Sequence, residues 1–578
     1  MPPKQAASVG RVKRGRHREV GILGVALAAS SEDEDYRPSG GAGSRRRRRI
    51  ADEEHGDEDV PLAQRRCQLQ HQQQRQQRQG AAAAGGASAA VADAPAGLPI
   101  DLPEEVLCQI LRLACAPAAG GAIPTAAAAA CVSRAWRAAV EACPDLWQHC
   151  NLSWRRCRPT DVALARTAPR WDHLRWLSLS GVAGVADAGL QTIAGCCPRL
   201  SSLALAHCTQ FTDRGLIAAL TTMLLRPAAP DGSTAPLRCL NLSFTQISPK
   251  VSGLDQVVRE VLAAQARNPS GPVLEELEVE GCPVLSHHGL RAVTEASVEA
   301  GRPLLSALRV LNLTQSAGAR SDFVLNIERL QYSCPALQQL CLNGLCGAAG
   351  WTWNASPSSL PQGAPPPGFP ALTHCQVAAK SNPDMAGLGT GATNVNDACL
   401  TRLLAHSPLL EQLDVSGCER LSPNCLATAI HPAAPLREVL LARSGACCDE
   451  GVAFLVDRFG GTLEAIDLSW GGGRITDAAT AALARCPRLH TVGLAGTAVT
   501  TDGVRQLLLA SDRHRQSSSG AGGQGGSGAG SGGGGGSGSR GGQPLRLDVS
   551  SCRGLDRAVR QAATLDGGRL RAALGLPG

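Results

Sequence analysis

The sequence predicts an α/β fold, a curved solenoid with short parallel strands on its concave face and helices outside. Three observations predict it. A six-residue pattern, LxxLxL, recurs along the chain, with Val or Ile replacing some leucines. Several copies are 26 or 27 residues apart: Leu174 to Leu200, then Leu410 to Leu436, Leu463 and Leu489. A Thr or Asp followed by an apolar run separates many copies. A single repeat of this size cannot bury its apolar face, whereas stacked neighbours can.

Each copy of the pattern predicts one strand, because alternate residues of a strand face opposite sides. The copies begin at Leu174, Leu200, Leu237, Leu274, Leu308, Leu337, Leu410, Leu436, Leu463 and Leu489. A degraded copy lies near Leu372, and residues 547–552 repeat the phase of residues 413–418. This period and core resemble leucine-rich repeats.

A helix is predicted after each strand to return the chain to the next one. In residues 211–216 and 475–480, Thr212 and Thr476 precede an Asp and an apolar run. Thr and Asp accept hydrogen bonds from the free N–H groups that begin a helix. We therefore expect these residues to cap the outer helices.

The 23 cysteines contain no CxxC pair and no zinc-finger spacing. Several keep phase with the repeats: Cys208, Cys282, Cys418 and Cys552 follow strands, and Cys197, Cys334 and Cys486 precede Pro. This phasing resembles the cysteine-containing class of leucine-rich repeats. It predicts buried thiols stacked along the solenoid, in a reducing compartment, and neither metal ligands nor redox sites.

The chain divides into seven predicted segments. They are a disordered tail (1–96), a small helical unit (97–155), the first part of the solenoid (171–343), a Gly/Pro-rich insertion with the degraded repeat (344–396), the second part (397–515), a Gly/Ser linker (516–543) and a terminal capping repeat (544–578). The tail combines charge runs with Gln and Ala/Gly tracts, which bury too little apolar surface to fold.

The helical unit carries motifs of its own. Asp101 and Glu104 form a capping-box pattern around Pro103, and Val106, Leu107, Ile110 and Leu111 follow on one predicted helical face. Residues 131–137 and 145–147 then place Trp136, Leu146 and Trp147 after an Ala-rich stretch. A unit of about 50 residues is marginal alone, which favours a partner helix.

The ordered series Leu102-Pro103, Ile110-Leu111, Trp136 and Leu146-Trp147, placed just before leucine-rich repeats, resembles an F-box. The chain is thus similar to the F-box/leucine-rich-repeat proteins, although the gap between Ile110 and Trp136 is longer than usual. The resemblance implies a Skp1-like adaptor as partner and, through it, a cullin/RING ubiquitin ligase core. It implies adaptor contacts by Leu102, Pro103, Val106, Leu107, Ile110, Leu111, Trp136, Leu146 and Trp147.

No catalytic constellation, metal site or cofactor motif is present in the sequence. A phosphate-binding loop, a paired-histidine zinc helix and a nucleophile elbow are all missing, and no stretch is apolar and long enough to cross a membrane. We therefore expect a non-catalytic receptor without cofactors, which brings a substrate close to another subunit's chemistry.

The predicted concave strands carry carboxylates in a chain of net charge +7. These are Glu276, Glu278, Glu280, Asp414, Glu438 and Asp467, with Trp470 or the Trp351/Trp353 loop as an aromatic anchor. The pattern predicts an acidic stripe that binds a basic protein substrate. A merely solvated acidic face is the simpler interpretation of the same residues.

Two other functions remain open at this stage. One is a leucine-rich-repeat scaffold whose F-box-like unit works outside a ligase. The other is an RNA-associated protein, based only on the basic clusters at residues 13–18 and 45–49. We expect no direct nucleic-acid contact, no membrane contact, and a nuclear or cytoplasmic location, with the basic clusters as candidate import signals.

Overall fold

The computed structural model describes residues 102–115, 122–153, 159–245, 253–267, 273–282, 288–314, 326–344, 360–361, 363–378, 395–520, 544–563 and 567–576. Four of the sequence predictions concern residues outside these ranges: the tail, its basic clusters, Trp351 with Trp353, and most of the predicted Gly/Ser linker.

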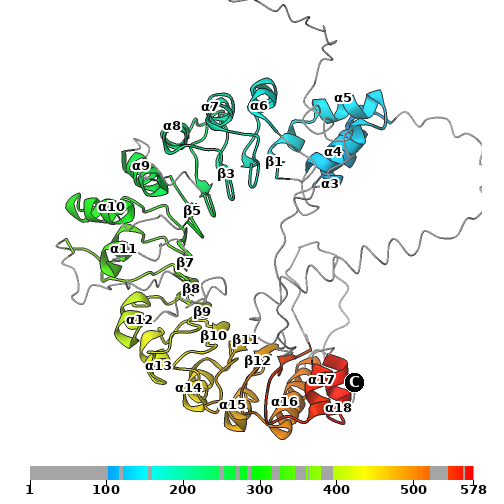
Figure 1. The fold of residues 1–578 in the computed structure, drawn as a ribbon, viewed down its shortest axis with the longest axis vertical. Helices are drawn as coiled ribbons and strands as arrows, with labels where there is room; N and C mark the ends of the chain where they lie inside the picture. The colour runs from blue at the N-terminus through cyan, green and yellow to red at the C-terminus, as the bar shows by residue number, and fades with distance from the viewer. Residues whose placement is uncertain are drawn as a thin grey trace, which may run out of the picture.

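One parallel sheet of thirteen strands runs through the molecule in chain order. Figure 1 shows the sheet on the inside of an open arc with the helices outside, so the predicted solenoid is confirmed. The strands are β1 (His149–Asn151), β2 (Trp176–Ser178), β3 (Ser202–Ala204), β4 (Cys239–Asn241), β5 (Glu276–Glu278), β6 (Val310–Asn312), β7 (Gln339–Cys341), β8 (His374–Gln376), β9 (Gln412–Asp414), β10 (Glu438–Leu440), β11 (Ala465–Asp467), β12 (Thr491–Gly493) and β13 (Arg546–Asp548).

The helices return the chain from each strand to the next. Before the sheet come α3 (Glu104–Ala114), α4 (Ala122–Ala130), α5 (Arg134–Ala142) and the 3-10 turn η2 (Pro144–Trp147). The outer layer holds α6 (Asp161–Thr167), η3 (Ala168–Arg170), α7 (Asp187–Cys196), α8 (Asp213–Leu224), α9 (Gly253–Arg267), α10 (His288–Glu299), α11 (Ile327–Ser333), α12 (Asp397–Leu403), α13 (Cys425–Ala429), α14 (Asp449–Phe459), α15 (Asp477–Leu483) and α16 (Thr501–Gly520). Then α17 (Arg557–Ala563) and α18 (Gly567–Ala573) end the described chain.

The middle residue of every strand pairs in register with the middle residues of its neighbours, as Leu203 does with Leu177 and Leu240. These residues point away from the concave face into one hydrophobic core that extends along the solenoid. Flanking strand residues point the other way and are mostly half-buried. The repeats are therefore held together by a continuous ladder of apolar side chains.

The buried thiols are a second ladder. Cys208, Cys282 and Cys552 are buried, and each Sγ donates to a carbonyl of the preceding repeat: to Leu179 at 3.2 Å, Leu242 at 3.4 Å and Leu494 at 2.9 Å. Burial raises the pKa of the Cys282 thiol to about 11, which keeps it protonated as a donor. The predicted structural role of these cysteines is confirmed.

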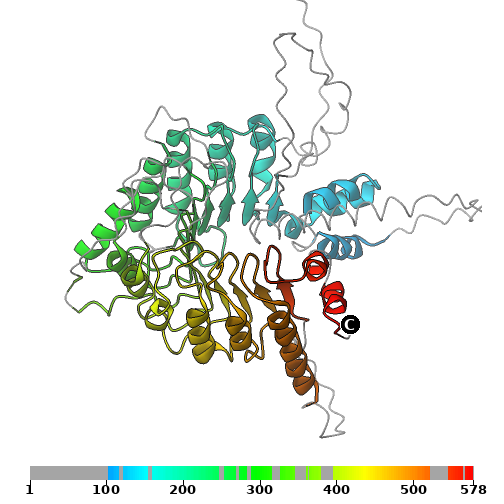
Figure 2. The same cartoon turned by 60° about the horizontal axis from the view of Figure 1, so that its bottom comes forward.

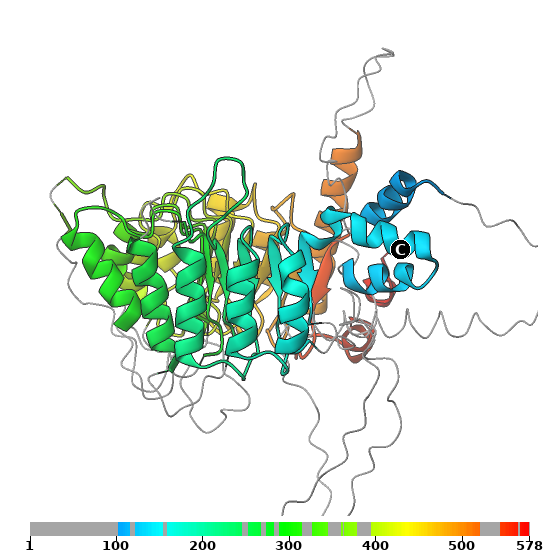
Figure 3. The same ribbon diagram turned by 90° about the horizontal axis from the view of Figure 1, so that it is seen from above.

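The structure differs from the predicted repeat boundaries at both ends. The sheet begins at β1, inside the segment assigned to the helical unit. The sequence did not predict this strand because it lacks the LxxLxL pattern. At the other end α16 runs to Gly520, past the predicted linker start at residue 516. Figure 3 shows α16, in orange, extending beyond the edge of the solenoid.

The insertion changes the helical layer between β7 and β8. The described residues of this connection include no helix. The neighbouring helices α11 and α12 meet instead, through Arg402 and Glu328, whose Nε–Oε1 and Nη2–Oε2 distances are 2.7 and 2.8 Å. Glu328 is buried, so this two-pronged pair fixes the junction of the two halves.

Candidate protein-binding surfaces

The helices α3, α4 and α5 with η2 form a unit with its own hydrophobic core, separate from that of the solenoid. Figure 2 shows this unit projecting from the N-terminal end of the arc. Leu107 and Leu111 of α3 pack there with Val140 of α5. Trp147 closes the core, and its indole N–H donates to the carbonyl of Val140 at 3.1 Å. We call this unit the hook.

One face of α3 is apolar and exposed. Val106, Ile110 and Leu113 have exposed fractions of 39, 38 and 75 %. Together with the exposed Pro103 they follow the spacing of one helical stripe, and we call these four residues the hook face. Such side chains on a small helical unit indicate a surface that a partner covers.

The burial of α3 corrects the predicted contact set. Leu107, Leu111, Leu146 and Trp147 are buried in the hook core and cannot offer their side chains to a partner. Leu102 and Trp136 are half-buried against the same core. Only Pro103, Val106 and Ile110 of the predicted set are exposed, and the structure adds the exposed Leu113, which the sequence interpretation did not include.

The start of α3 also differs from prediction. The helix begins at Glu104 with Pro103 at the N-cap position and no side-chain cap. Asp101 lies outside the described residues, so the predicted capping box stays a prediction.

On the concave face, β5 carries three carboxylates in a column: Glu276, Glu278 and, just past the strand, Glu280. We call them the β5 acidic column. Glu278 accepts a hydrogen bond from the Asn241 amide, and Glu280 accepts one from Asn312 at 3.4 Å. None of the salt bridges between described residues includes these three glutamates; the nearest one joins Arg238 to Glu275.

The electrostatics of the column follow from this arrangement. Burial raises the pKa of Glu278, and the charges of Glu276 and Glu280 raise it further, against a lowering by the Asn241 amide. Three like charges without a cation repel one another in a half-buried place. A cationic partner would relieve that repulsion.

The remaining predicted carboxylates form a second group, on β9 to β11. Glu438 lies on β10, while Asp414 and Asp467 each accept the N–H of the serine two residues on, Ser416 at 3.0 Å and Ser469 at 2.9 Å. Strands β6 to β8 separate this group from the β5 acidic column and present neutral residues such as Gln339 and Gln376. The predicted single acidic stripe is therefore wrong: there are two groups.

Trp470 is not a free anchor either. Its backbone has φ 63°, and the Arg443 guanidinium lies over its ring at 5.1 Å. On the ring's other side, a Cβ at Gly496 would lie 2.6 Å from the indole. The residue fills a slot between neighbouring repeats, three residues after the end of β11.

The same slot, after β3 and β4, holds a pair of stacked rings that the sequence interpretation missed. His207 and Phe244 lie three residues after β3 and β4, have φ 59° and 54°, and stack with ring centroids 4.7 Å apart. Gly281 follows in the next repeat, where a Cβ would meet the Phe244 ring at 2.2 Å. An alignment of the repeats at the third residue after each strand would have shown aromatic rings at a position where several other repeats have glycine.

The described residues include no group of three or more His, Cys, Asp or Glu placed to hold a metal ion. Within the same residues, no helix has the length and apolarity that a bilayer span needs.

Of the comparisons with known proteins, one matches the region of the hook. Residues 100–153 match the family described as F-box-like. No curated protein sequence matches the chain. Among solved structures it is similar to a chain in the crystal structure of the Rad7 and Elc1 complex in yeast, with 16% identity, a TM-score of 0.35, and coverage of 78% of this chain and 90% of that chain. A TM-score this low carries no functional argument. The sequence match and the exposed hook face together make residues 100–153 an F-box-like domain.

Proposed function

We propose that this protein is the substrate receptor of a Skp1–cullin–F-box type ubiquitin ligase. The observation that carries the proposal is the hook face: Val106, Ile110 and Leu113 are exposed on a helix of an F-box-like domain at the end of a solenoid. A Skp1-like adaptor would cover these side chains and connect the receptor to the cullin/RING core. Burying each one would contribute roughly 1–2 kcal/mol to the association.

In this function the chain supplies proximity and no chemistry of its own. In this proposal the hook binds the ligase, and the concave face of the arc in Figure 1 binds the substrate. Holding two reactants together raises their effective concentration, which accelerates transfer without a catalytic residue on the receptor.

We place substrate capture on the concave face, at the β5 acidic column. Among the described residues the hydrogen-bond partners of Glu278 and Glu280 are the neutral amides of Asn241 and Asn312, and none of the three glutamates has a salt bridge. An arginine- or lysine-rich segment would supply cations to the column. In the second group, Asp414 and Asp467 already accept hydrogen bonds from backbone N–H groups, so this group is the weaker candidate.

At the level of the individual family member, we propose a relationship to F-box/LRR-repeat protein 6. The long interval inside the F-box and residues 395–418, which read VNDACLTRLLAHSPLLEQLDVSGC, resemble that protein.

The hook is tested by capture of the full-length protein on an immobilised Skp1-like adaptor. Val106→Asp with Ile110→Asp should abolish capture, and Leu102→Ala with Pro103→Ala should weaken it. Val162→Asp is the matched control, because Val162 is 63 % exposed on α6, away from the hook. Capture of the double Asp variant at the wild-type level, or no capture of wild type, would favour a scaffold that works outside a ligase.

The acidic column needs a separate test. Lysines at positions 276, 278 and 280 should abolish binding of an arginine-rich peptide, and binding by the wild type should weaken as salt rises. The matched control is Glu275→Lys, on the adjacent position paired with Arg238. Equal loss with the control variant would assign the effect to net charge rather than to the column.

A further inference from the structure

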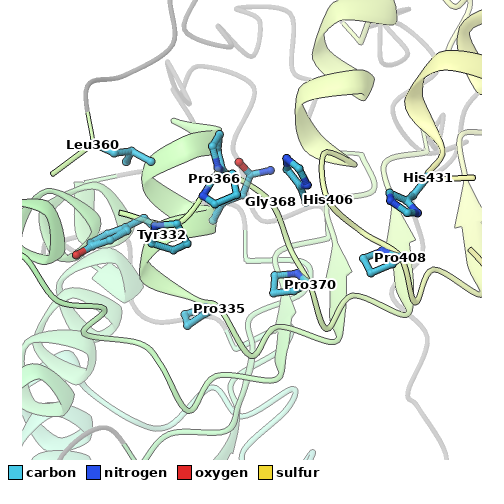
Figure 4. A pocket seen from close by; sticks show the side chains of 12 residues that line it. Tyr332, Pro335, Leu360, Pro366, Gly368, Pro370, His406, Pro408 and His431 are labelled. Carbon is cyan, nitrogen blue, oxygen red and sulfur yellow. The ribbon is translucent and has the colours of Figure 1, made fainter. Parts of the chain in front are cut away.

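A pocket of about 350 Å³ lies where the described end of the insertion packs against α11 and the loop before β9 (Figure 4). Half of its wall comes from the insertion, including Pro366, Gly368 and Pro370. Tyr332 and His406 contribute from the solenoid. The residues that line the pocket include no Asp, Glu, Lys or Arg, and most of them carry the rings of Pro, Tyr or His.

The insertion side of the pocket is built rigidly. Residues 365–367 are three consecutive prolines, whose fixed φ leaves little freedom to lose on binding. Phe369 is fully buried in the solenoid core and anchors this wall. At Gly368 a Cβ would lie 2.5 Å from both the Ala405 carbonyl oxygen and the His406 Cβ, so only glycine permits this close contact.

Two features on the solenoid side of the pocket are energetically unfavourable. Gln331 of α11 is 3 % exposed, and its amide donates to the Arg402 carbonyl at 2.8 Å, yet its side-chain oxygen is buried without a hydrogen-bond partner. A buried acceptor without a hydrogen bond has lost its water and gained no partner, which is unfavourable. His406 has φ 47°, a left-handed conformation that is strained for a residue with a Cβ. Strain and an unpaired polar group at one pocket are typical of binding sites.

We propose that this pocket binds a tryptophan side chain of a partner polypeptide. Proline and tyrosine rings form stacking walls for a flat aromatic group, the mode by which proline-rich segments and aromatic side chains recognise each other. The indole N–H is a donor without an acceptor and matches the Gln331 oxygen after a small opening of the wall. The volume is near the lower end for ligand pockets and suits one large side chain.

The pocket lining contains no carboxylate, Lys or Arg, which separates this site from the acidic column. The pocket is also independent of the hook, so the proposal goes beyond the receptor function and does not depend on it. In the fold the pocket lies beside the insertion between β7 and β8, and insertions in solenoids often provide binding surfaces.

The test measures binding of N-acetyl-L-tryptophanamide to the full-length protein by ligand-observed NMR and calorimetry. The matched probe is its 1-methylindole analogue, which lacks the donor. We expect saturable binding of the first and at least tenfold weaker binding of the second. Pro366→Ala and Gln331→Met should each weaken binding at least fivefold, while the exposed Pro230→Ala should not change it.

Equal affinity for both probes, or equal affinity of the Pro366→Ala and wild-type proteins, would overturn the proposal. So would a wild type that binds no probe. Binding that appears only when Trp351 and Trp353 are both changed to Ala would also overturn it, because a side chain of the protein itself would then be the occupant. Far-ultraviolet circular dichroism of each variant checks that the fold is kept.

Discussion

The carboxylate of Asp449, at the start of α14, clamps Thr476, the N-cap residue of α15 in the next repeat. One oxygen accepts the Thr476 N–H at 2.9 Å and the other accepts its hydroxyl at 2.6 Å. The same clamp joins Asp187 to Thr212 and Asp477 to Thr500. Successive outer helices are therefore tied together by hydrogen bonds as well as by the shared core.

Removing one clamp should weaken the solenoid at that junction. We expect Asp449→Ala to lower the free energy of unfolding by about 1–3 kcal/mol, because the capping threonine loses its acceptor. Urea titration followed by circular dichroism measures it. Glu450→Ala, the exposed acidic residue of the same helical turn, is the control and should cost less than about 1 kcal/mol. Equal losses would show that the clamp adds nothing beyond the helix dipole.

At two of these clamps a glycine makes room for the carboxylate, Gly215 beside Asp187 and Gly503 beside Asp477. A Cβ at Gly215 would lie 2.1 Å from the Asp187 carboxyl group, whereas a Cβ at Gly195 would meet nothing within 4 Å. We expect Gly215→Ala to destabilise the protein by about 1–3 kcal/mol through overpacking. Gly195→Ala should stabilise it by about 0.5–1 kcal/mol through helix propensity. Thermal unfolding of both variants checks the opposite signs, and a shift in the same direction would contradict this packing.

The β5 acidic column should reduce stability at neutral pH. Glu278 has a folded-state pKa raised above its ordinary 4.5, so the stabilising neutral form is present at low pH and lost as pH rises through the folded pKa. Glu278→Gln should therefore raise the unfolding midpoint at pH 7, and its advantage over wild type should shrink towards pH 4. A variant that is less stable than wild type at pH 7 would show that the Asn241 contact outweighs the repulsion.

Much of the fold could be predicted because the leucine pattern states directly which strand residues face the core. The middle residues Leu203, Leu277 and Leu413 were identified that way and are all buried. The first strand was missed because Trp147 and Cys150 occupy the first two leucine positions of the pattern, and only Leu152 matches it.

The candidate surfaces were less predictable, because a helical pattern does not say which apolar residues stay exposed. Ile110 and Leu111 are neighbours in one apolar run, yet Leu111 is buried and Ile110 is exposed. Likewise Trp470 looked like a free anchor, but its partners Arg443 and Gly496 lie one repeat away on either side. Only the stacking of the repeats decides such contacts.

The most direct test of the receptor account is hydrogen–deuterium exchange of the full-length protein with and without a Skp1-like adaptor. We predict slower exchange over α3, residues 104–114, when the adaptor is added, and no change over α7, residues 187–196, in the solenoid. Unchanged exchange over α3, or protection confined to the solenoid helices, would contradict the assignment of the hook face as the adaptor-binding surface.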